Sequence, residues 1–382
     1  MLFLGLASNY AAKDILRHSF ILGTKKHYHA LERALSTRYG ASLANTSLIY
    51  SGRSAIAIAL KSFIASGRLK KGDHVAINGF TCYAVVQAIT HAKLVSVYLD
   101  IEPNSPNYSA ATLKTACQSD KKLKCFILQN TFGMPVNIES FSAVKKEYNL
   151  LCLEDLAHCA GRYYQKTDGS HQEIGTFGEA TCLSFGKGKA IDTITGGAVL
   201  LRDPSLSFPK SFQKSTLVRR QKTGDVPRAS WYPIFGATAR GLAHLHLEKP
   251  FLALLLKLRF IERSADTKLL ENTTITCWQA RLALRQLQNL KSTPLRNFCL
   301  VSDKAACLSE LQKSGFRLEE SWYDTPVAPA RYYKKLNYPE SSCPNSVYFA
   351  SHVINLPTWY HSPKKRAELS RAKSIIKYYE VK

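Results

Sequence analysis

The middle of the chain alternates two hydrophobic patterns. From about residue 50 to residue 200, short apolar runs bounded by turn residues alternate with longer segments of helical periodicity. The short runs predict strands and the longer segments predict helices. Alternation at this spacing implies a mostly parallel sheet with helices on both faces. The predicted strands are His74–Ile77, Lys93–Leu99, Cys125–Leu128, Leu150–Leu153 and Ala198–Leu201, and the predicted helices are Ser54–Ser66, Tyr83–His91, Ser109–Ser119 and Ile138–Tyr148.

The pattern changes after residue 202. A leucine-rich stretch with interleaved basic residues, Leu242–Ile261, predicts an amphipathic helix. That helix either packs on its own domain or on a dimer partner, or it lies on a membrane surface. Further helices are predicted over Trp278–Leu290 and Lys364–Tyr379. We expect a large domain over residues 1–202 with an N-terminal arm over about 1–28, a helical insertion over 203–271, and a small C-terminal α+β domain over 272–382.

The composition is that of an ordinary globular protein, with 45% apolar and 21% charged residues. No apolar run approaches the roughly 18 residues that span a bilayer. The first residues are apolar but lack the basic segment of a secretion signal. We therefore expect a cytoplasmic protein. The ten cysteines are scattered without metal-ligand spacing, so we expect reduced thiols and no structural metal.

The net charge of +24 is the unusual feature of the composition. Such a charge attracts polyanions, among them nucleic acids, anionic lipid surfaces and phosphorylated substrates. The basic residues are spread along the chain and no nucleic-acid-binding motif is present, so we expect no specific nucleic-acid partner. A solvated basic surface is one interpretation. A preference for an anionic substrate, or a peripheral contact with a membrane, is the other.

Two segments carry residue types that bind pyridoxal phosphate (PLP). An apolar run from Leu151 ends in Asp155, and a later Ser-Phe-x-x-x-Lys run ends in Lys189 before a Gly-Gly turn. In PLP sites an acid faces the pyridine nitrogen and a lysine bonds the cofactor's aldehyde. A buried strand-end carboxylate also needs a positive partner, which a protonated pyridine ring supplies. Lys187, two residues before Lys189, competes with it for this role.

The same residues have structural interpretations as well. Asp155 is equally suited to cap a helix that starts at Leu156. His158 either reaches the cofactor's phenolate oxygen or the substrate, or it is a core histidine. The amine of Lys189 must lose its proton to attack an aldehyde, so burial or neighbouring positive charge should lower its pKa.

The phosphate group has candidate ligands in two places. Gly52 permits a tight turn, so that backbone N–H groups of Arg53 and Ser54 at the start of a helix face an anion. Ser184 is the second candidate donor. Its alternative is a strand-end serine that is capped by backbone.

With these residues assembled, the chain resembles the DegT/StrS family of PLP-dependent sugar aminotransferases, which have the type I aspartate-aminotransferase-like fold. The family pattern S-F-x-x-x-K-x-[IL]-x-x-x-x-G-G-A lies without a gap on the segment that starts at Ser184. The resemblance therefore makes Lys189 the lysine that bonds the cofactor. The segment Glu154-Asp155-x-Ala157-His158 is similar to the family's E-D-x-A-[QH], which places Asp155 on the pyridine nitrogen.

Other landmarks of the family are present with changes. Ser51-Gly52-Arg53-Ser54-Ala55 is similar to S-G-T-x-A, with Arg53 in place of the threonine. The run from Asn272 to Gln279-Ala280 resembles N-x-R-M-x-x-x-Q-A, and the resemblance implies that Asn272 reaches the phosphate in the partner subunit. The aromatic residue that stacks on the cofactor ring would fall at Cys82, and the adjacent Tyr83 is its expected substitute.

The resemblance implies a homodimeric PLP-dependent aminotransferase with shared active sites. It would move an amino group from an amino acid, glutamate in the family, to a nucleotide-linked keto-sugar for polysaccharide or related amino-sugar biosynthesis. Lys189, Asp155 and His158 would be its catalytic residues. Two alternatives stay open. One is an enzyme of the same fold with different chemistry, such as a sugar dehydratase. The other is a non-catalytic basic protein that kept the fold and binds a membrane or nucleic acid.

Overall fold

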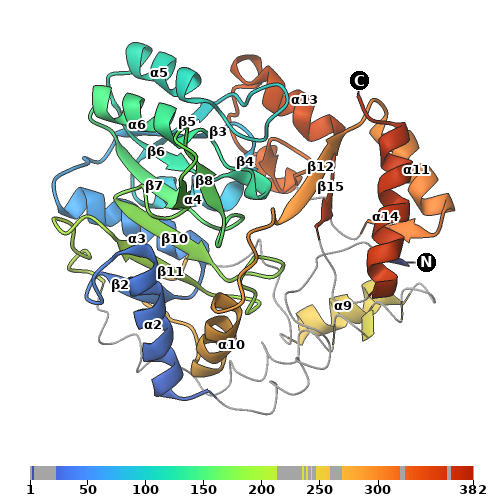
Figure 1. The fold of residues 1–382 in the computed structure, drawn as a ribbon, viewed down its shortest axis with the longest axis horizontal. Helices are drawn as coiled ribbons and strands as arrows, with labels where there is room; N and C mark the ends of the chain where they lie inside the picture. The colour runs from blue at the N-terminus through green and yellow to red at the C-terminus, as the bar shows by residue number, and fades with distance from the viewer. Residues whose placement is uncertain are drawn as a thin grey trace.

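The computed structural model describes residues 2–3, 23–212, 247–258, 269–318, 323–358 and 363–381, with single residues between 235 and 242. Figure 1 shows a large body built around a sheet and a second body formed by the C-terminal part of the chain. This confirms the predicted α/β fold with a smaller C-terminal α+β part. Most of the predicted N-terminal arm and most of the 203–271 insertion lie outside the described residues.

The large body is built on a seven-stranded sheet. Five neighbouring strands, β10, β7, β6, β3 and β5, run parallel, whereas β11 runs antiparallel to both β10 and β2. The inner strands are buried on both faces, which explains their nearly continuous apolar runs. In spatial order the strands are β2 (Thr46–Ile49), β11 (Gly197–Leu201), β10 (Ala180–Ser184), β7 (Leu151–Asp155), β6 (Leu123–Leu128), β3 (His74–Asn78) and β5 (Val95–Leu99).

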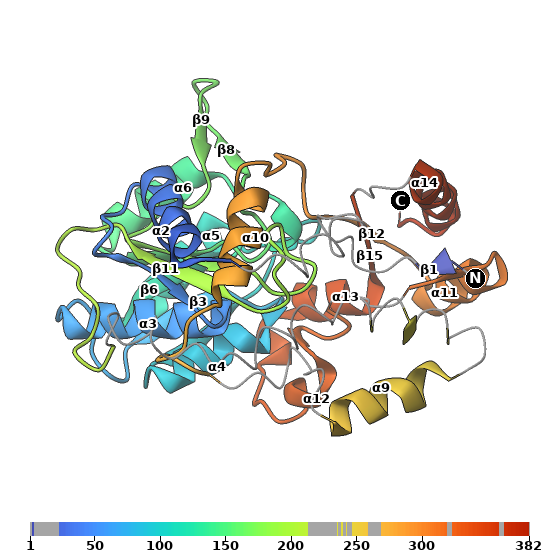
Figure 2. The ribbon, with the colours of Figure 1, turned by 90° about the horizontal axis from the view of Figure 1, so that it is seen from below.

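Helices cover both faces of this sheet. Figure 2 shows α3 and α4 on one face and α2, α5, α6 and α10 on the other. Each layer has its own apolar core, one around Ile56 of α3 and the other around Leu31 of α2 and Phe141 of α6. These helices are α2 (Lys25–Tyr39), α3 (Gly52–Ala65), α4 (Tyr83–His91), α5 (Ala110–Ser119), α6 (Ile138–Glu147) and α10 (Cys277–Leu287).

The smaller body centres on an antiparallel pair of strands, β12 (Arg296–Leu300) and β15 (Val353–Pro357). A short parallel pair, β14 (Val327–Ala328) with β4 (Thr81–Cys82), joins it to the large body. Another short pair joins β1 (Leu2–Phe3) to β13 (Phe316–Arg317). The remaining elements are β8 (Tyr163–Gln165), β9 (His171–Glu173), η1 (Thr131–Gly133), α9 (Glu248–Lys257), α11 (Lys304–Lys313), α12 (Ala330–Tyr333), η5 (Glu340–Ser342), α13 (Pro344–His352) and α14 (Pro363–Tyr378).

The leucine-rich stretch that predicted a helix over Leu242–Ile261 contributes one described helix, α9. Leu247, Leu254 and Leu258 are each about half exposed along it. Among the described helices none is both long and apolar enough to cross a membrane. Packing against a partner and contact with a membrane surface both remain predictions for this segment.

Candidate active site

Asp155 is the last residue of β7, at the carboxyl end of the parallel strands, where α/β sheets bind their ligands. The residue is buried, with 6% of its surface exposed. Oδ1 accepts the N–H of Ala157 at 3.0 Å, while Oδ2 makes no hydrogen bond with any described residue. Residues 156–161 form turns, so Asp155 does not cap a helix. A buried acid with one open oxygen is a site for a cationic N–H group.

Burial and charge act against each other at Asp155. Burial raises the pKa of Asp155 to about 6, and the N–H of Ala157 and the positive charge of Lys189 pull it back down. The lysine is therefore close enough to this acid to influence it. A bound cation would stabilise the ionised carboxylate in the same way as Lys189 does.

His158 lies in the turn that follows Asp155 and is also buried. The N–H of Phe132 donates to its Nδ1 at 3.1 Å, and the two rings lie nearly parallel at 6.2 Å. Because Nδ1 accepts, Nε2 carries the proton of the neutral ring. Burial lowers the pKa of His158 well below its usual range, and the charges of Lys189 and Arg296 lower it further. The side chain is therefore a neutral N–H donor.

Lys189 lies on the loop between β10 and β11 and is half-buried. The loop keeps its shape through a buried acid, Asp192. Its Oδ2 accepts the N–H of Gly188 at 2.8 Å and its Oδ1 accepts the N–H of Ile194 at 3.0 Å. The backbone N–H of Lys189 donates to the carbonyl of Gly186 at 3.1 Å. Asp192 thus holds the turn that presents Lys189 near Asp155 and His158.

Helix α10 clamps the same loop from outside. The side chain of Gln286 accepts the N–H of Asp192 and donates to its carbonyl, both at 2.8 Å. Gln279 donates to the carbonyl of Thr195 at 2.9 Å and to that of Thr193 at 3.2 Å. Sequence reasoning missed Asp192 and Gln286. The one signal was the spacing of the two glutamines, seven residues apart on one helix face.

Gly52 and Ser184 meet at the start of α3. A Cβ atom added to Gly52 would lie 2.7 Å from the Cβ of Ser184, so only glycine fits this contact. The amino end of α3 therefore lies directly beside the serine hydroxyl. Ser184 Oγ also accepts the N–H of Gly186, at 3.4 Å. Backbone N–H groups at a helix start and a neighbouring hydroxyl form a cradle for an anion.

The other two residues of this predicted phosphate site differ in their surroundings. Ser51 caps α3, and its Oγ accepts the N–H of Ser54 at 3.2 Å. The Ser54 hydroxyl contacts that of Ser51 and accepts the N–H of Leu270 at 3.1 Å. The Ser54 hydroxyl is therefore already used in hydrogen bonds at the start of α3. Arg53 is buried in the first turn of α3.

Two other predicted residues, Tyr83 and Asn272, make no hydrogen bond or ring contact with Asp155, His158 or Lys189 in the described part of the chain. The ring of Tyr83 stacks on that of Tyr332 with centroids 4.1 Å apart and planes 6° apart, so this face is already covered. Asn272 is exposed on a turn near the start of α3. The turn is held there by the N–H of Tyr50, which donates to the carbonyl of Thr273 at 2.9 Å. Its predicted contact with a partner subunit remains a prediction.

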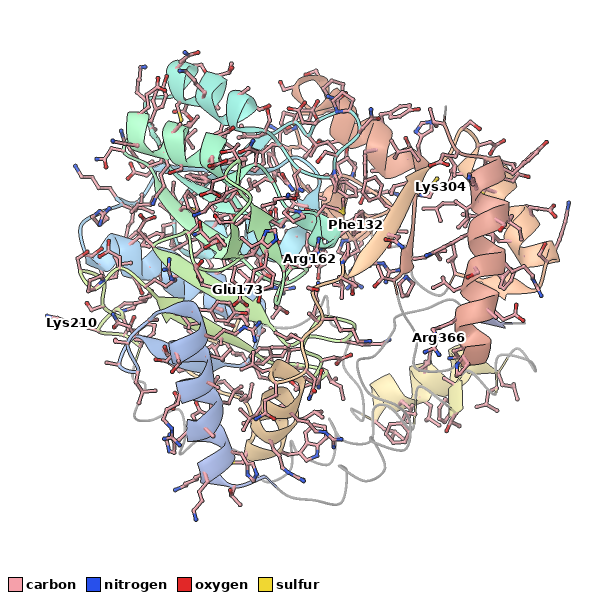
Figure 3. The ribbon with its side chains drawn as sticks, viewed as in Figure 1. Phe132, Arg162, Glu173, Lys210, Lys304 and Arg366 are labelled. Atoms are coloured by element: carbon pink, nitrogen blue, oxygen red, sulfur yellow. The ribbon has the colours of Figure 1, made fainter. Side chains whose placement is uncertain are left out.

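Figure 3 shows Phe132 at the side of the large body that faces β12. The backbone N–H of this residue bonds His158, so the candidate site lies on that side.

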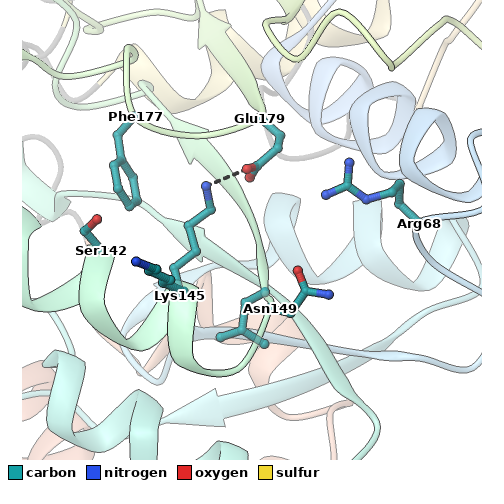
Figure 4. Close-up of a pocket in the computed structure, with 8 residues that line it drawn as sticks. Arg68, Ser142, Lys145, Asn149, Phe177 and Glu179 are labelled. Atoms are coloured by element: carbon teal, nitrogen blue, oxygen red, sulfur yellow. Dashed lines mark hydrogen bonds and ion pairs between the residues drawn. The ribbon is translucent and has the colours of Figure 1, made fainter.

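A separate cavity of about 230 Å³ lies beside Asn149 and Leu150, which precede β7. It is therefore at the opposite end of that strand from Asp155. Figure 4 shows Lys145 and Glu179 joined by an ion pair inside it. Ligands of open α/β sheets bind at the carboxyl ends of the strands, so this cavity is not the candidate active site.

The chain belongs to the DegT/DnrJ/EryC1/StrS aminotransferase family, whose family model matches residues 6–224. A GDP-perosamine synthase from Caulobacter vibrioides is 28% identical over 189 residues, which cover 50% of this chain and 46% of that protein. The chain thus matches about half the length of its curated relatives.

Solved structures share the fold over nearly the whole chain. PseC of Helicobacter pylori, an aminotransferase involved in the biosynthesis of pseudoaminic acid, superposes with a TM-score of 0.66 at 18% identity. The alignment covers 99% of each chain. The dehydratase ColD, which acts on GDP-4-keto-6-deoxymannose, superposes with a TM-score of 0.63 at 14% identity and covers 97% of this chain and 100% of that one. At these identities the likeness establishes the fold.

Proposed function

We propose that this chain is a PLP-dependent aminotransferase that transfers an amino group from glutamate to a nucleotide-linked keto-sugar. The observation that carries the proposal is the open oxygen of buried Asp155, placed near Lys189 at the carboxyl ends of the strands. Such an acid needs a cationic partner. The protonated pyridine ring of PLP is a partner of that kind, and the cradle of Gly52 and Ser184 suits its phosphate.

Each residue has a defined task in this proposal. PLP, when bound, supplies an electron-withdrawing ring and an aldehyde that accepts and releases an amino group. Asp155 binds the ring nitrogen and keeps it protonated. The Nζ atom of Lys189 would bond the aldehyde carbon and, once released as a free amine, would take the proton from the donor's α-carbon and deliver it to the former aldehyde carbon. His158 donates its Nε2–H to an oxygen of the cofactor or substrate.

The substrates follow from charge and from the family. The excess of positive charge, +24, favours an anionic acceptor such as a sugar linked to a nucleoside diphosphate. Relatives named GDP-perosamine synthase act in amino-sugar synthesis and support a sugar acceptor. We also propose a homodimer in which Asn272 of one subunit contacts the phosphate bound by the other.

Absorbance spectroscopy tests the cofactor and the first half of the reaction together. We expect purified protein with PLP to show a band at the edge of the visible range that shifts to shorter wavelength when glutamate is added. Lys189→Ala should lack this band because it has lost the amine that bonds the aldehyde. Lys187→Ala is the matched control and should keep both the band and the shift.

The alternatives give different results in the same experiment. Absence of the band from the wild-type protein would contradict the proposal and favour a non-catalytic protein that kept the fold. A sugar dehydratase would remove a hydroxyl from the sugar and leave no new amino group on it. Mass analysis of the sugar product after incubation with ¹⁵N-labelled glutamate therefore separates amino transfer from dehydration.

A further inference from the structure

Tyr323 is a buried aromatic residue beside the candidate active site. Its ring packs against Phe80 with centroids 4.8 Å apart, and it meets the rings of Phe132 and His158 at 5.9 Å each. Its backbone has φ = 63°, a left-handed conformation that is unfavourable for a bulky side chain. Strained residues of this kind gather at binding sites, where the surrounding structure holds them in place.

A pair of strands brings Tyr323 to this position. Val327 of β14 pairs with Thr81 of β4, and the N–H of Thr81 donates to the carbonyl of Pro326 at 2.7 Å. The segment that starts at Tyr323 is therefore attached to the strand that ends in Cys82. Tyr323, a residue of the smaller body, is thereby held against the large body beside the short side chain of Cys82.

The phenol of Tyr323 lies near the acid that the proposed function assigns to the cofactor. Burial raises the pKa of Tyr323 well above its usual range, and Cys82 and Asp155 add to that effect. The hydroxyl makes no hydrogen bond with any described residue. The ring belongs to the apolar cluster against which Cys82 packs, and it lies beside His158, three residues after Asp155.

Tyr83, the aromatic residue next to Cys82 in the sequence, is differently placed. It starts α4, and its ring face is covered by Tyr332. Releasing it would break a stacked aromatic pair, which contributes about 0.5–1.5 kcal/mol beyond the area it buries. Tyr323, by contrast, already lies beside His158 of the candidate site.

We propose that Tyr323 supplies the aromatic surface on which the PLP ring packs, in the space that the short side chain of Cys82 leaves open. This inference rests on the proposed function, because it needs a planar cofactor ring bound at Asp155. Its consequence is that the smaller body contributes directly to cofactor binding.

Binding of pyridoxamine 5′-phosphate tests the inference without the covalent bond to Lys189. We expect Tyr323→Leu to weaken binding of this compound about tenfold in calorimetric titration, because the stacked ring is lost. Tyr323→Phe should bind it within about twofold of the wild type, since the ring and not the hydroxyl makes the contact. Tyr83→Leu is the matched control and should leave the affinity unchanged.

A second variant restores the missing surface from the other side. Cys82→Phe in the Tyr323→Leu background should recover most of the lost affinity, because it places an aromatic ring in the same space. A loss caused by misfolding would not be recovered in this way. Unchanged affinity in Tyr323→Leu, or a loss in Tyr83→Leu instead, would overturn the inference.

The test also separates this inference from the proposed function. If the wild-type protein binds neither PLP nor pyridoxamine 5′-phosphate, the proposed function itself fails. If the wild type binds both and Tyr323→Leu binds them equally well, the proposed function stands and only the role of Tyr323 is wrong.

Discussion

The two adjacent acids that end β7 differ in how their oxygens are used. Glu154 is fully buried, and hydrogen-bond donors from the surrounding chain reach both of its oxygens. Asp155 next to it uses only one oxygen in this way. Of these two neighbouring acids, the first therefore holds the fold, and the second has an oxygen available for the proposed cofactor. The donors to Glu154 are the hydroxyl of Tyr164 and the N–H groups of Gly175, Phe177 and Gly178, at 2.7–2.9 Å.

The open acid should cost the cofactor-free protein stability. The pKa of Asp155 is about 6 in the folded protein, above the ordinary value of 3.8. The folded state therefore binds more protons than the unfolded state between about pH 4 and pH 6, and stability falls as the pH rises through that window. The full loss is about 3 kcal/mol at most, as a shift of one pKa unit is worth 1.36 kcal/mol.

Asp155→Asn removes this pH dependence. We expect the cofactor-free variant to match the wild type near pH 4 and to be more stable by up to about 3 kcal/mol near pH 7. The variant should bind PLP more weakly, since an amide does not hold a protonated ring nitrogen. Urea unfolding of both proteins across this pH range measures the difference. Asp168 is the control, because hydrogen bonds from Ser170 lower its pKa instead of raising it, so Asp168→Asn should give no gain in stability as the pH rises. A stability difference at Asp155→Asn that did not change with pH would contradict the assignment to Asp155.

At the scale of elements, α10 is joined by hydrogen bonds to the loop between β10 and β11, which carries Lys189 (the lysine loop). Gln286 bonds both backbone groups of Asp192, so its loss would remove two buried hydrogen bonds from the turn. We expect Gln286→Ala to lower stability by about 1–3 kcal/mol and to weaken PLP binding, because the turn that presents Lys189 loosens. Gln288→Ala, at the exposed residue that follows the end of α10, should change neither. Thermal unfolding and PLP titration check both variants, and equal effects at the two positions would refute the clamp.

The sequence predicted elements better than it predicted their contacts. The helix expected over Tyr83–His91 has those bounds, and the expected strand over His74–Ile77 extends one residue further as β3. The strand β10 was not predicted, because its run Ala-Thr-Cys-Leu-Ser mixes polar and apolar residues and its burial comes from neighbouring strands. The antiparallel direction of β11 also depends on pairing, which local periodicity does not encode.

In the candidate site, too, individual residues could be predicted from the sequence but their contacts could not. The motif residues Lys189, Asp155 and His158 could be found from the sequence because their types and order are dictated by chemistry. Asp192 and Gln286 could not be paired, because they are 94 positions apart and their contact exists only in the folded chain. Tyr83 was predicted from its position next to Cys82, and in the structure one face of its ring stacks on Tyr332, a contact that the local sequence does not reveal.

At the scale of the whole molecule, the proposed dimer has shared active sites, and mixed subunits test this. Lys189→Ala and Asn272→Ala should each be inactive alone. A heterodimer of the two has one site with both residues intact, since Lys189 and Asn272 then come from different subunits. After unfolding and refolding as an equal mixture, activity should return to about a quarter of wild type. No recovery would show that each site is built from a single chain.

The clamp of α10 on the lysine loop has a consequence for how the protein is made. A ribosome adds roughly 5–20 residues each second, so the 94 positions between Asp192 and Gln286 take roughly 5–20 s to synthesise. Throughout that interval Asp192, which holds the turn that carries Lys189, lacks its two hydrogen bonds to Gln286. The loop that carries Lys189 therefore gains the support of α10 only after the ribosome has made residues 277–287. By then all seven strands of the large sheet have been synthesised, so the support of this loop is among the last contacts that the large body can make.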